Sequence, residues 1–402
     1  MRIGVIGAGY VGLTTAACFA RLGHRVVCAD VDGAKVEALR AGEVGLHEPD
    51  LPELVAEGLA NGRLEFVHGT SLSDVDFTFV CVPTPEGDDG AADLTAVEEV
   101  LGQVTSRVVL KSTVPVGTGA RHPGVVSNPE FLREGHAVED FLRPQRIVVG
   151  ARHERDARAV ADLYARTGAP VVLTDNTSAE LVKYASNCFL ALKLSYVNTL
   201  AELCERLDAD VDAVTGGMRL DDRIGASCLA PGPGWGGSCL PKDTLALLAT
   251  ARAADVDFAT LEAAVTTNRR QPHRVADAVR AELGALTGRR IALLGLTFKA
   301  GTNDLRDSPA LAVAAVLAQE GAELVAYDPC VNADLPGITV AGTAAEAATG
   351  ADALLVLTEW PEFAELDWPD LVRRVRGPLI VDTRGVVPGD KAVQTGFRLV
   401  RG

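Results

Sequence analysis

Residues 234–243 read Gly-Trp-Gly-Gly-Ser-Cys-Leu-Pro-Lys-Asp. Cys239 therefore lies between a glycine-rich loop and the charged pair Lys242 and Asp243. Glycine lets a backbone approach a ligand closely, and a neighbouring cation favours the thiolate, which is the nucleophilic form of cysteine. An isolated cysteine is more often a small buried residue without chemistry. The flanking glycines and charges favour a nucleophile that holds a carbonyl substrate covalently between two oxidation steps.

The start of the chain predicts a dinucleotide site, which would supply the oxidant that such a cysteine needs. A short apolar strand, a Gly-x-Gly-x-x-Gly loop, a helix and a second strand follow one another at residues 3–6, 7–12, 13–22 and 25–29. In such a βαβ unit, Gly7 forms the tight turn, Gly9 admits the pyrophosphate to the helix start and Gly12 allows close helix–strand packing. Asp30 ends the second strand, where a carboxylate accepts ribose hydrogen bonds and repels a 2′-phosphate, so we expect NAD rather than NADP. Lys35 is placed to approach the adenosine end, although a solvated helix lysine would give the same pattern.

Composition and charge restrict the class of protein. The chain has 402 residues and 48% apolar side chains, which suits two or three globular domains. Its net charge of −16 argues against nucleic acid as a partner. Its eight cysteines lack metal-binding spacing, so we expect a reduced, cytoplasmic protein without a bound metal. No apolar run is long enough for a membrane helix and a strand begins almost at residue 1, so we expect neither membrane association nor a signal peptide.

Alternating strands and helices up to about residue 175 predict a doubly wound parallel sheet. Beyond the first two strands, the candidate strands are residues 77–82, 108–111, 125–127, 147–150 and 171–173. The pattern then changes to one uninterrupted helix over 176–207, and residues 177–180 have the spacing of a capping box for its start. A helix of this length is typical of a bridge between domains or of a subunit interface.

A mostly helical section over 208–283 precedes a second α/β segment. The segment contains candidate strands at 290–295, 322–327, 353–357 and 379–382, and a candidate helix at 309–319. Asp328 follows the second of these strands, as Asp30 ends the second strand of the chain, but Gly-Leu-Thr-Phe-Lys at 295–299 replaces the glycine fingerprint. We therefore expect a second nucleotide-sized site that recognises a different headgroup.

Four further groups of polar residues accompany Cys239. They are Glu130 and Glu134 after a strand, Lys183 and Asn187 one helical turn apart, the segment 222–225 that contains Arg223, and the segment 298–309. Each group alone is explained by a surface turn, a helix cap or exposed helix charges. Their occurrence together, in this order and spacing, favours a shared function.

Together these motifs resemble the UDP-glucose/GDP-mannose dehydrogenase family over essentially the whole chain. The resemblance implies an α/β fold with two Rossmann-like doubly wound parallel-sheet domains, joined by a long central helix at a homodimer interface. We place the NAD-binding domain at residues 1–175, the central helical dimerisation region with the cysteine loop at 176–283, and the nucleotide-sugar domain at 284–402. The implied activity is NAD-dependent oxidation of the C6 hydroxymethyl group of a nucleotide sugar to a carboxylate.

The resemblance also assigns roles to individual residues, among them an arginine, Arg223, that reaches the substrate in a neighbouring subunit. The implied catalytic set is the nucleophile Cys239, the oxyanion donors Lys183 and Asn187, the water-holding Thr113 and Asp243, and Glu130, which assists hydrolysis. The implied cofactor contacts are Gly7, Gly9, Tyr10, Val11, Gly12, Asp30, Lys35, Thr84, Thr113, Glu134 and Arg306. The implied substrate contacts are Phe131, Leu132, Arg133, Lys183, Asn187, Arg223, Gly236, Phe298, Lys299 and Arg384.

Ser238 and the Arg-Ile-Gly segment at 223–225 resemble the branch of the family that acts on UDP-glucose. Relatives that act on 2-acetamido sugars usually have a histidine before the cysteine, so UDP-glucose is the expected substrate, and a GDP-mannose or UDP-GlcNAc type of sugar nucleotide stays open. Two other functions also stay open. An ordinary two-electron hydroxy-acid dehydrogenase would need neither Cys239 nor the second nucleotide-like domain. A non-catalytic nucleotide-sugar-binding relative would have no chemical need for the catalytic set.

The chain departs from the family pattern after Thr113. Only residues 114–124 separate it from the next candidate strand, and they include three glycines and two prolines. A parallel crossover needs about a dozen residues or more and usually contains a helix. We therefore expect that the crossover helix is missing and that the link runs extended past the sheet.

Overall fold

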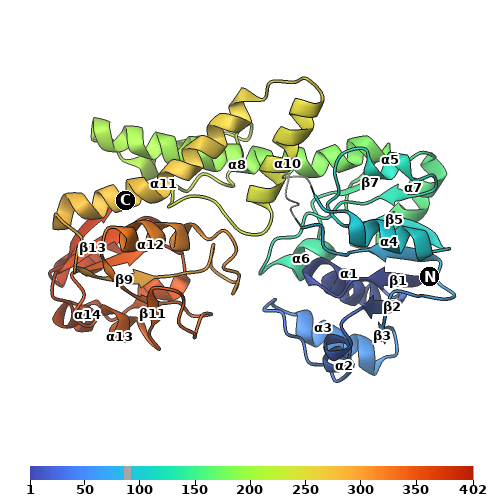
Figure 1. Cartoon of the computed structure of the whole chain (residues 1–402), viewed down its shortest axis with the longest axis horizontal. Helices are drawn as coiled ribbons and strands as arrows, with labels where there is room; N and C mark the ends of the chain where they lie inside the picture. The colour runs from blue at the N-terminus through green and yellow to red at the C-terminus, as the bar shows by residue number, and fades with distance from the viewer. Residues whose placement is uncertain (86–91, 402) are drawn as a thin grey trace. The chain divides into compact units, whose positions relative to one another are not determined.

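The computed structural model describes residues 1–85 and 92–401, and the chain divides into two compact units (Figure 1). The first unit comprises Met1–Ser186 and Leu245–Val256, and the second comprises Asn187–Thr244 and Asp257–Gly402. Each unit is built on one sheet, and a long helix continues from the first unit into the second. The expected α/β fold with two Rossmann-like sheets joined by a long helix is confirmed.

The sheet of the first unit has eight strands in the order β3-β2-β1-β4-β5-β6-β7-β8. The strands are β1 Arg2–Ile6, β2 Arg25–Asp30, β3 Leu64–His68, β4 Phe77–Val80, β5 Arg107–Leu110, β6 Val126–Ser127, β7 Ile147–Ala151 and β8 Val171–Thr174. Because β1 pairs in parallel with both β2 and β4, the winding of the chain reverses between these neighbours. The carboxyl ends of β1 and β4 therefore form a topological switch point, where ligands bind in such sheets.

Helices cover both faces of this sheet because alternate strand residues point to opposite sides. Ile3 and Val5 of β1 pack in a large cluster with apolar residues of α1, α3, α6 and α7, whereas Ile6 packs in a second cluster with α4. The helices are α1 Tyr10–Arg21, α2 Gly33–Arg40, α3 Leu51–Ala60, α4 Thr95–Gln103, α5 Thr118–Arg121, α6 Ala137–Leu142 and α7 Glu154–Ala161, with a 3-10 helix at Asp162–Thr167.

Three local features of this unit differ from the sequence-based expectation. β3 was not expected, and β7 runs antiparallel to β6 while β8 runs parallel to β7, so the last two strands are reversed. The prediction of a helix-free link after Thr113 is wrong in one respect, because Thr118–Arg121 form the single helical turn α5. Gly117, with φ +92°, sits at the N-cap of that turn in a left-handed conformation that glycine adopts without strain.

The long helix α8 spans Asn176–Leu207, the limits expected from the sequence, and is continuous in Figure 1. Its predicted capping box is wrong. Asp175 caps the helix, since its side chain accepts hydrogen bonds from the Ser178 amide at 2.9 Å and the Ser178 hydroxyl at 2.7 Å. Glu180, the expected box partner, is directed to another part of the first unit. Three helices follow: α9 Val211–Arg219, α10 Leu240–Ala253 and α11 Ala259–Leu283.

The second unit contains an all-parallel six-stranded sheet in the order β11-β10-β9-β12-β13-β14. Its strands are β9 Arg290–Leu294, β10 Glu323–Tyr327, β11 Ile338–Val340, β12 Ala353–Val356, β13 Leu379–Asp382 and β14 Arg398–Arg401. Its helices are α12 Pro309–Gln319, α13 Ala344–Ala348, α14 Trp368–Arg374 and α15 Gly389–Gln394, with a 3-10 helix at Pro361–Glu365. The switch point lies between β9 and β12, so the loops after these strands are placed for a second ligand. Within residues 1–85 and 92–401, the longer helices are too polar to cross a bilayer.

Candidate active site

The glycine loop after β1 has the shape that a dinucleotide requires. Gly7 has φ +98°, and a Cβ there would lie 2.7 Å from the Cys81 carbonyl oxygen. A Cβ on Gly12 would lie 1.7 Å from the Gly7 carbonyl oxygen, so both positions need glycine. A Cβ on Gly9, in contrast, would meet no heavy atom within 4 Å, and Gly9 is the N-cap of α1 with no side-chain cap. The start of α1 therefore has room and amide donors for a pyrophosphate, so these residues fit NAD.

Asp30 is held at the end of β2, beside this loop. Its Oδ2 accepts hydrogen bonds from the Ala8 amide at 2.8 Å and from Lys35 Nζ at 3.2 Å, and its Oδ1 accepts one from the Asp32 amide at 2.9 Å. Burial raises the pKa of Asp30, but the bonds from the two amides and from Lys35 outweigh it, so the pKa lies below its usual range. Asp30 is thus an ionised acceptor beside the glycine loop, and Lys35 is ion-paired to it. Val11 packs its side chain into the large hydrophobic cluster.

We expect Asp30→Ala to weaken the preference for NAD. A ribose hydrogen bond to a charged group contributes about 1.5–3 kcal/mol, so the ratio of kcat/KM with NAD to that with NADP should fall roughly tenfold or more. Steady-state kinetics with both cofactors measure this ratio. Asp32→Ala is the matched control, because Asp32 is a neighbouring carboxylate that caps α2 instead; an equal loss of preference in this control would contradict the role of Asp30.

A buried ion pair joins α8 to the loop after β6. Lys183 Nζ lies 2.5 Å from Glu130 Oε1, and both side chains are almost fully buried. Glu130 Oε2 accepts a hydrogen bond from the Leu132 amide at 2.6 Å. Burial raises the pKa of Glu130, but the charge and hydrogen bond of Lys183 outweigh it, with further contributions from the Leu132 amide and Lys111, so the pKa lies below its usual range. Phe131 lies under two cations, with the Arg146 guanidinium 3.7 Å and Lys183 Nζ 5.7 Å from its ring centre.

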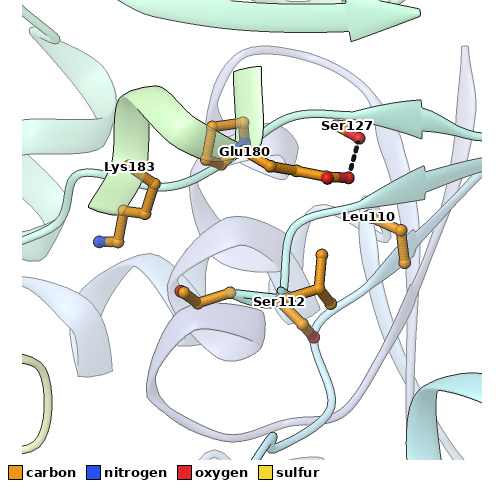
Figure 2. A pocket seen from close by; sticks show the side chains of 8 residues that line it. Leu110, Ser112, Ser127, Glu180 and Lys183 are labelled. Atoms are coloured by element: carbon orange, nitrogen blue, oxygen red, sulfur yellow. Dashed lines mark hydrogen bonds between the residues drawn. The ribbon is translucent and has the colours of Figure 1, made fainter. Parts of the chain in front are cut away.

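Thr113 and Lys183 line the same small pocket of the first unit, together with Ser112, Ser127 and Glu180 (Figure 2). Thr84 donates a hydrogen bond to the Thr113 carbonyl oxygen at 2.8 Å, which ties the segments after β4 and β5 together. In Figure 2, Glu180 and Lys183 leave α8 in different directions, and Glu180 extends toward Ser127. Thr113 and Lys183, two of the expected catalytic residues, are therefore brought to one cavity.

Glu180 fixes the short link after Thr113. Its carboxylate accepts hydrogen bonds from the amides of Gly117 at 2.7 Å and Gly119 at 2.8 Å, and from Ser127 Oγ at 2.8 Å. Burial raises the pKa of this carboxyl, although the three donors oppose that shift. The single turn α5 is thus anchored on α8, the helix that carries Lys183.

We expect Gly119→Ala to destabilise this anchor. An added Cβ would lie 2.5 Å from Ser127 Oγ and 2.7 Å from Glu180 Oε1, so the buried hydrogen bonds have to separate. Overpacking of this kind costs about 1–3 kcal/mol, measured as the free energy of unfolding in urea. Gly102→Ala in α4 is the control, since a Cβ there meets no atom within 4 Å and alanine favours helix. Equal stability of the two variants would show that the link tolerates movement.

In the second unit, Cys239 caps the start of α10. Its carbonyl oxygen accepts a hydrogen bond from the Asp243 amide at 2.9 Å, so the thiol lies at the N-terminal end of a 14-residue helix. The positive end of a helix stabilises an anion there. Lys242, the cation expected to act on the thiol, contacts Asp243 Oδ1 with its Nζ at 2.9 Å. The other oxygen of Asp243 accepts a 2.6 Å hydrogen bond from Asn187 Nδ2 of α8, so Asp243 links the turn after Cys239 to the turn after Lys183.

The glycines before Cys239 are packed against the nucleotide-like domain of the same unit. A Cβ on Gly236 would lie 1.9 Å from the Asp307 carbonyl oxygen, and one on Gly237 would lie 2.7 Å from the Phe298 ring. The Gly237 amide also donates to the Arg306 carbonyl oxygen at 3.1 Å. Two further predicted substrate residues lie after β9 and β13: Lys299, whose Nζ is 5.7 Å from the Phe298 ring centre, and Arg384. The cysteine loop and Phe298 are therefore closely packed within one unit.

Several predicted ligand-binding arginines form ion pairs in the structure. Arg133, Arg223 and Arg306 each direct two guanidinium nitrogens to one aspartate, namely Asp140, Asp221 and Asp304. Arg384 donates to the Leu357 carbonyl oxygen at 3.0 Å and lies 3.2 Å from Glu359 Oε2. The Arg223 side chain is 89% exposed, so it lies on the surface of its unit rather than among the other predicted residues.

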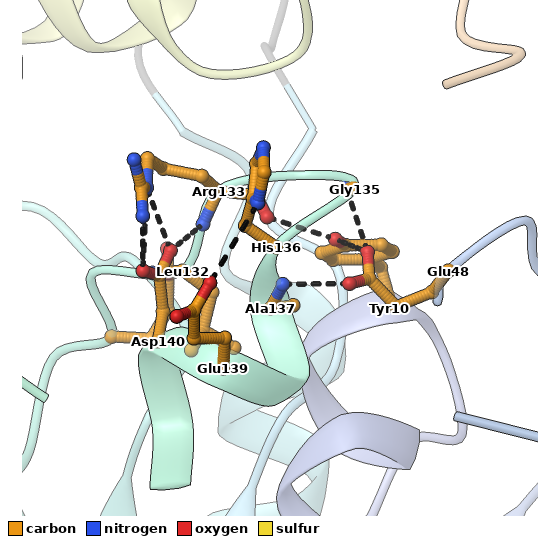
Figure 3. Close-up of polar contacts among 10 residues, drawn as sticks. Tyr10, Glu48, Leu132, Arg133, Gly135, His136, Ala137, Glu139 and Asp140 are labelled. Atoms are coloured by element: carbon orange, nitrogen blue, oxygen red, sulfur yellow. Dashed lines mark hydrogen bonds and ion pairs between the residues drawn. The ribbon is translucent and has the colours of Figure 1, made fainter. Parts of the chain in front are cut away.

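Two buried residues of the first unit escaped the sequence analysis. Lys111 is fully enclosed, donates to Asn128 Oδ1 and to the Tyr164 hydroxyl, each at 3.3 Å, and has its pKa lowered to about 8 by burial. Glu48 contacts Tyr10 and the loop that contains Glu134 (Figure 3). A lysine at the end of the apolar candidate strand 108–111 was a usable signal for Lys111, but nothing in the residues around Glu48 indicated its distant partners.

Comparison with known proteins agrees with this geometry. Models of the UDP-glucose/GDP-mannose dehydrogenase family match the chain in three parts: the NAD binding domain at residues 1–168, the central domain at 177–270 and the UDP binding domain at 292–389. The chain belongs to this family, and it is an NAD-dependent dehydrogenase.

Individual relatives cover the whole length. The chain is 44% identical over 430 residues to a UDP-glucose 6-dehydrogenase of Rhizobium meliloti, covering 99% of this chain and 98% of that protein. It is 43% identical to the UDP-glucose 6-dehydrogenase AglM of Haloferax volcanii, covering 96% of this chain and 97% of that one. A solved UDP-glucose dehydrogenase from Pyrobaculum islandicum is 38% identical, with a TM-score of 0.91 and coverage of 100% and 97%. A UDP-D-ManNAc dehydrogenase structure from Pyrococcus horikoshii is 28% identical, with a TM-score of 0.89 and coverage of 100% and 99%.

Proposed function

We propose that this chain oxidises C6 of UDP-glucose in two steps to give UDP-glucuronate. The observation that carries the proposal is Cys239 at the N-terminal end of α10, in a chain whose first unit carries a dinucleotide loop after β1 and an acceptor, Asp30, at the end of β2. A two-electron dehydrogenase has no use for a nucleophilic thiol, whereas oxidation to a carboxylate passes through an aldehyde that has to be retained. The full-length relatives named as UDP-glucose dehydrogenases support the choice of sugar nucleotide.

The first half of the reaction produces the aldehyde. NAD, when bound, accepts one hydride in each of the two oxidation steps, and in the first step the proton of the C6 hydroxyl leaves to water or a base. The Cys239 thiolate then adds to the aldehyde carbon and forms a thiohemiacetal. We assign Lys183 and Asn187, one turn apart on α8, as the donors that stabilise the developing oxyanion. Each is held in orientation by a carboxylate, Lys183 by Glu130 and Asn187 by Asp243.

The second half releases the acid. Loss of the second hydride from C6 and of the hydroxyl proton to water or a base converts the thiohemiacetal into a thioester of Cys239. Water attacks the thioester carbon and gives one proton to a carboxylate, the carbon–sulfur bond breaks so that the sulfur leaves as the thiolate, and the carboxylic acid loses its proton to solvent. We assign Thr113, Asp243 and Glu130 to this water. Two features support Glu130 as an acceptor of a water proton: it is ionised, and its other contacts are to Lys183 and the Leu132 amide.

We also propose a homodimer through α8, in a reducing, cytoplasmic setting that keeps the thiol active. Phe189, Tyr196 and Leu203 follow one another at seven-residue spacing on this helix, with exposed fractions of 61%, 60% and 50%. Residues seven apart lie on one helix face, and an exposed apolar stripe of this kind is typical of an interface. Light scattering on wild type and on Tyr196→Glu tests it; a monomeric wild type would contradict the dimer.

The decisive experiment on function is the ratio of NADH formed to UDP-glucose consumed, with excess NAD. A ratio of about two, with UDP-glucuronate as product, is expected because two hydrides leave C6. A ratio of about one would indicate an aldehyde-level oxidation. UDP-glucose binding without NADH formation would favour a binding-only relative, and turnover of GDP-mannose or UDP-GlcNAc alone would correct the substrate.

A further inference from the structure

Glu48 lies at the centre of a cluster that joins two separate parts of the first unit (Figure 3). It is 4% exposed and comes from the segment between α2 and α3. Its carboxylate accepts a hydrogen bond from the Tyr10 hydroxyl, and 2.7 Å bonds from the Gly135 and Ala137 amides. Tyr10 is the first residue of α1, directly after the Gly9 position that is open to a pyrophosphate.

The loop on the other side of Glu48 carries two predicted ligand contacts, Arg133 and Glu134. Gly135 has φ +78°, and Ala137 is the first residue of α6, whose N-cap His136 makes no side-chain cap. Glu48 therefore supplies the missing cap from a distant segment. The Tyr10 hydroxyl also lies 3.2 Å from the Arg133 carbonyl oxygen, so the tyrosine contacts both ends of the link.

The chemistry of the cluster keeps its hydrogen bonds directional. The pKa of Tyr10 is raised above its usual range by burial, by the hydrogen bond to Glu48 and by the nearby charges of Glu48 and Glu134. Its hydroxyl therefore stays protonated and donates. Glu48 has three donors directed at its two oxygens, which is the arrangement an ionised carboxylate satisfies and an amide cannot. The opposite end of the loop is fixed separately, since the Arg133 amide and guanidinium both bind Asp140.

We propose that Glu48 is a positioning residue that couples cofactor binding at the start of α1 to the order of loop 133–137. A ligand that fixes Tyr10 would, through Glu48, hold the Gly135 and Ala137 amides and with them Arg133 and Glu134. The dinucleotide loop and the predicted ligand contacts Arg133 and Glu134 are then coupled within the first unit. The inference rests on the proposed function only in naming NAD as the ligand of the glycine loop.

The test combines two variants that remove the same link. Glu48→Gln keeps the shape of the side chain but presents an amide NH2 to backbone donors, and Tyr10→Phe keeps the ring and removes the hydroxyl. Dissociation constants for NADH come from its fluorescence, and hydrogen–deuterium exchange of peptides covering 133–137 is followed with and without NADH. In wild type we expect NADH to slow exchange of these peptides. In each variant we expect the Kd for NADH to rise roughly fivefold and the protection of loop 133–137 to be lost. The double variant should have a Kd no higher than that of the weaker-binding single variant.

Glu57→Gln is the matched control, because Glu57 is an exposed carboxylate of α3 that pairs with Arg21. Arg21 is the last residue of α1, at the opposite end from Tyr10. Glu57→Gln should leave Kd and exchange unchanged. The proposal is overturned if NADH protects loop 133–137 equally in wild type and both variants, or if the effects on Kd multiply in the double variant. If wild type does not bind NADH, the proposed function is contradicted instead. The link can then still be tested without ligand, because we expect loop 133–137 to exchange faster in both variants than in Glu57→Gln.

Discussion

Replacement of Cys239 by serine should lower UDP-glucuronate formation by about a thousandfold or more. A serine hydroxyl is not ionised near neutral pH, and the end of α10 stabilises an anion only where one forms. The variant therefore retains the first hydride transfer but cannot hold the aldehyde as a thiohemiacetal. Single-turnover measurements should show at most about one NADH per bound sugar, followed by very slow further oxidation.

Cys228→Ser provides the control for this experiment. Cys228 lies in the same unit before the glycine loop and is half-buried, so its substitution tests general damage to this region. Its activity should stay within about twofold of wild type, as for substitutions away from reacting groups. Near-normal acid formation by Cys239→Ser would exclude the thioester route.

Loss of the amine at position 183 should cost both stability and activity. Lys183→Met leaves Glu130 buried without its 2.5 Å partner, and breaking a buried pair in this way costs about 3–5 kcal/mol. Urea unfolding at neutral pH measures the change. Lys193→Met is the control on the same helix, since Lys193 donates to the carbonyl oxygens of Ile224 and Gly225 and is not paired with a buried carboxylate in the part of the chain that the structure describes. If Lys183→Met were as stable as Lys193→Met, Glu130 would have to be hydrated or paired with another cation in the variant.

The same pair determines how stability depends on pH. In the folded wild type the pKa of Glu130 lies below its unfolded value, so the folded state binds the proton less tightly. The stabilisation from this group is present above about pH 4.3 and is lost as the pH falls through the folded pKa. In Lys183→Met, we expect burial to raise the pKa of Glu130. The difference in unfolding free energy between wild type and the variant should therefore shrink on acidification. A constant difference between pH 7 and pH 4 would contradict this assignment.

The regular parts of the fold were predictable from short-range pattern. The limits of α8 and α12 and the first βαβ unit follow from apolar periodicity and glycine spacing, which act within one element. The reversal of β7 and β8 was not predictable, because strand residues alternate in the same way whichever direction the strand runs. The single turn α5 was missed for a related reason: Glu180, 61 residues after Gly119, satisfies its amides.

In the candidate site, too, residues with a local sequence signal were predicted and their long-range contacts were not. Cys239, Lys183 and Asn187 were predicted from residue type, spacing and the family resemblance, but their contacts were not. The sequence placed Lys242 as the activating cation, whereas in the structure Lys242 contacts Asp243 and the helix end faces the thiol instead. Glu48 was missed altogether, because its partners lie 38 to 89 residues away. Contacts across such separations depend on how the sheet brings loops together, which one sequence does not show.

The tight packing of the cysteine loop restricts how its specificity can be redesigned. Any side chain at position 236 would strike the Asp307 carbonyl group, and one at 237 would strike Phe298, whereas position 9 at the dinucleotide loop has open space around it. A directed-evolution library aimed at another sugar nucleotide would therefore lose nearly every member mutated at 236 or 237 to misfolding of the loop. Lys299 and Arg384, which follow β9 and β13, offer side chains that can be varied without a Cβ clash of this kind. The mutational tolerance of this enzyme is thus expected to be uneven, with the two glycines before Cys239 fixed by their close packing.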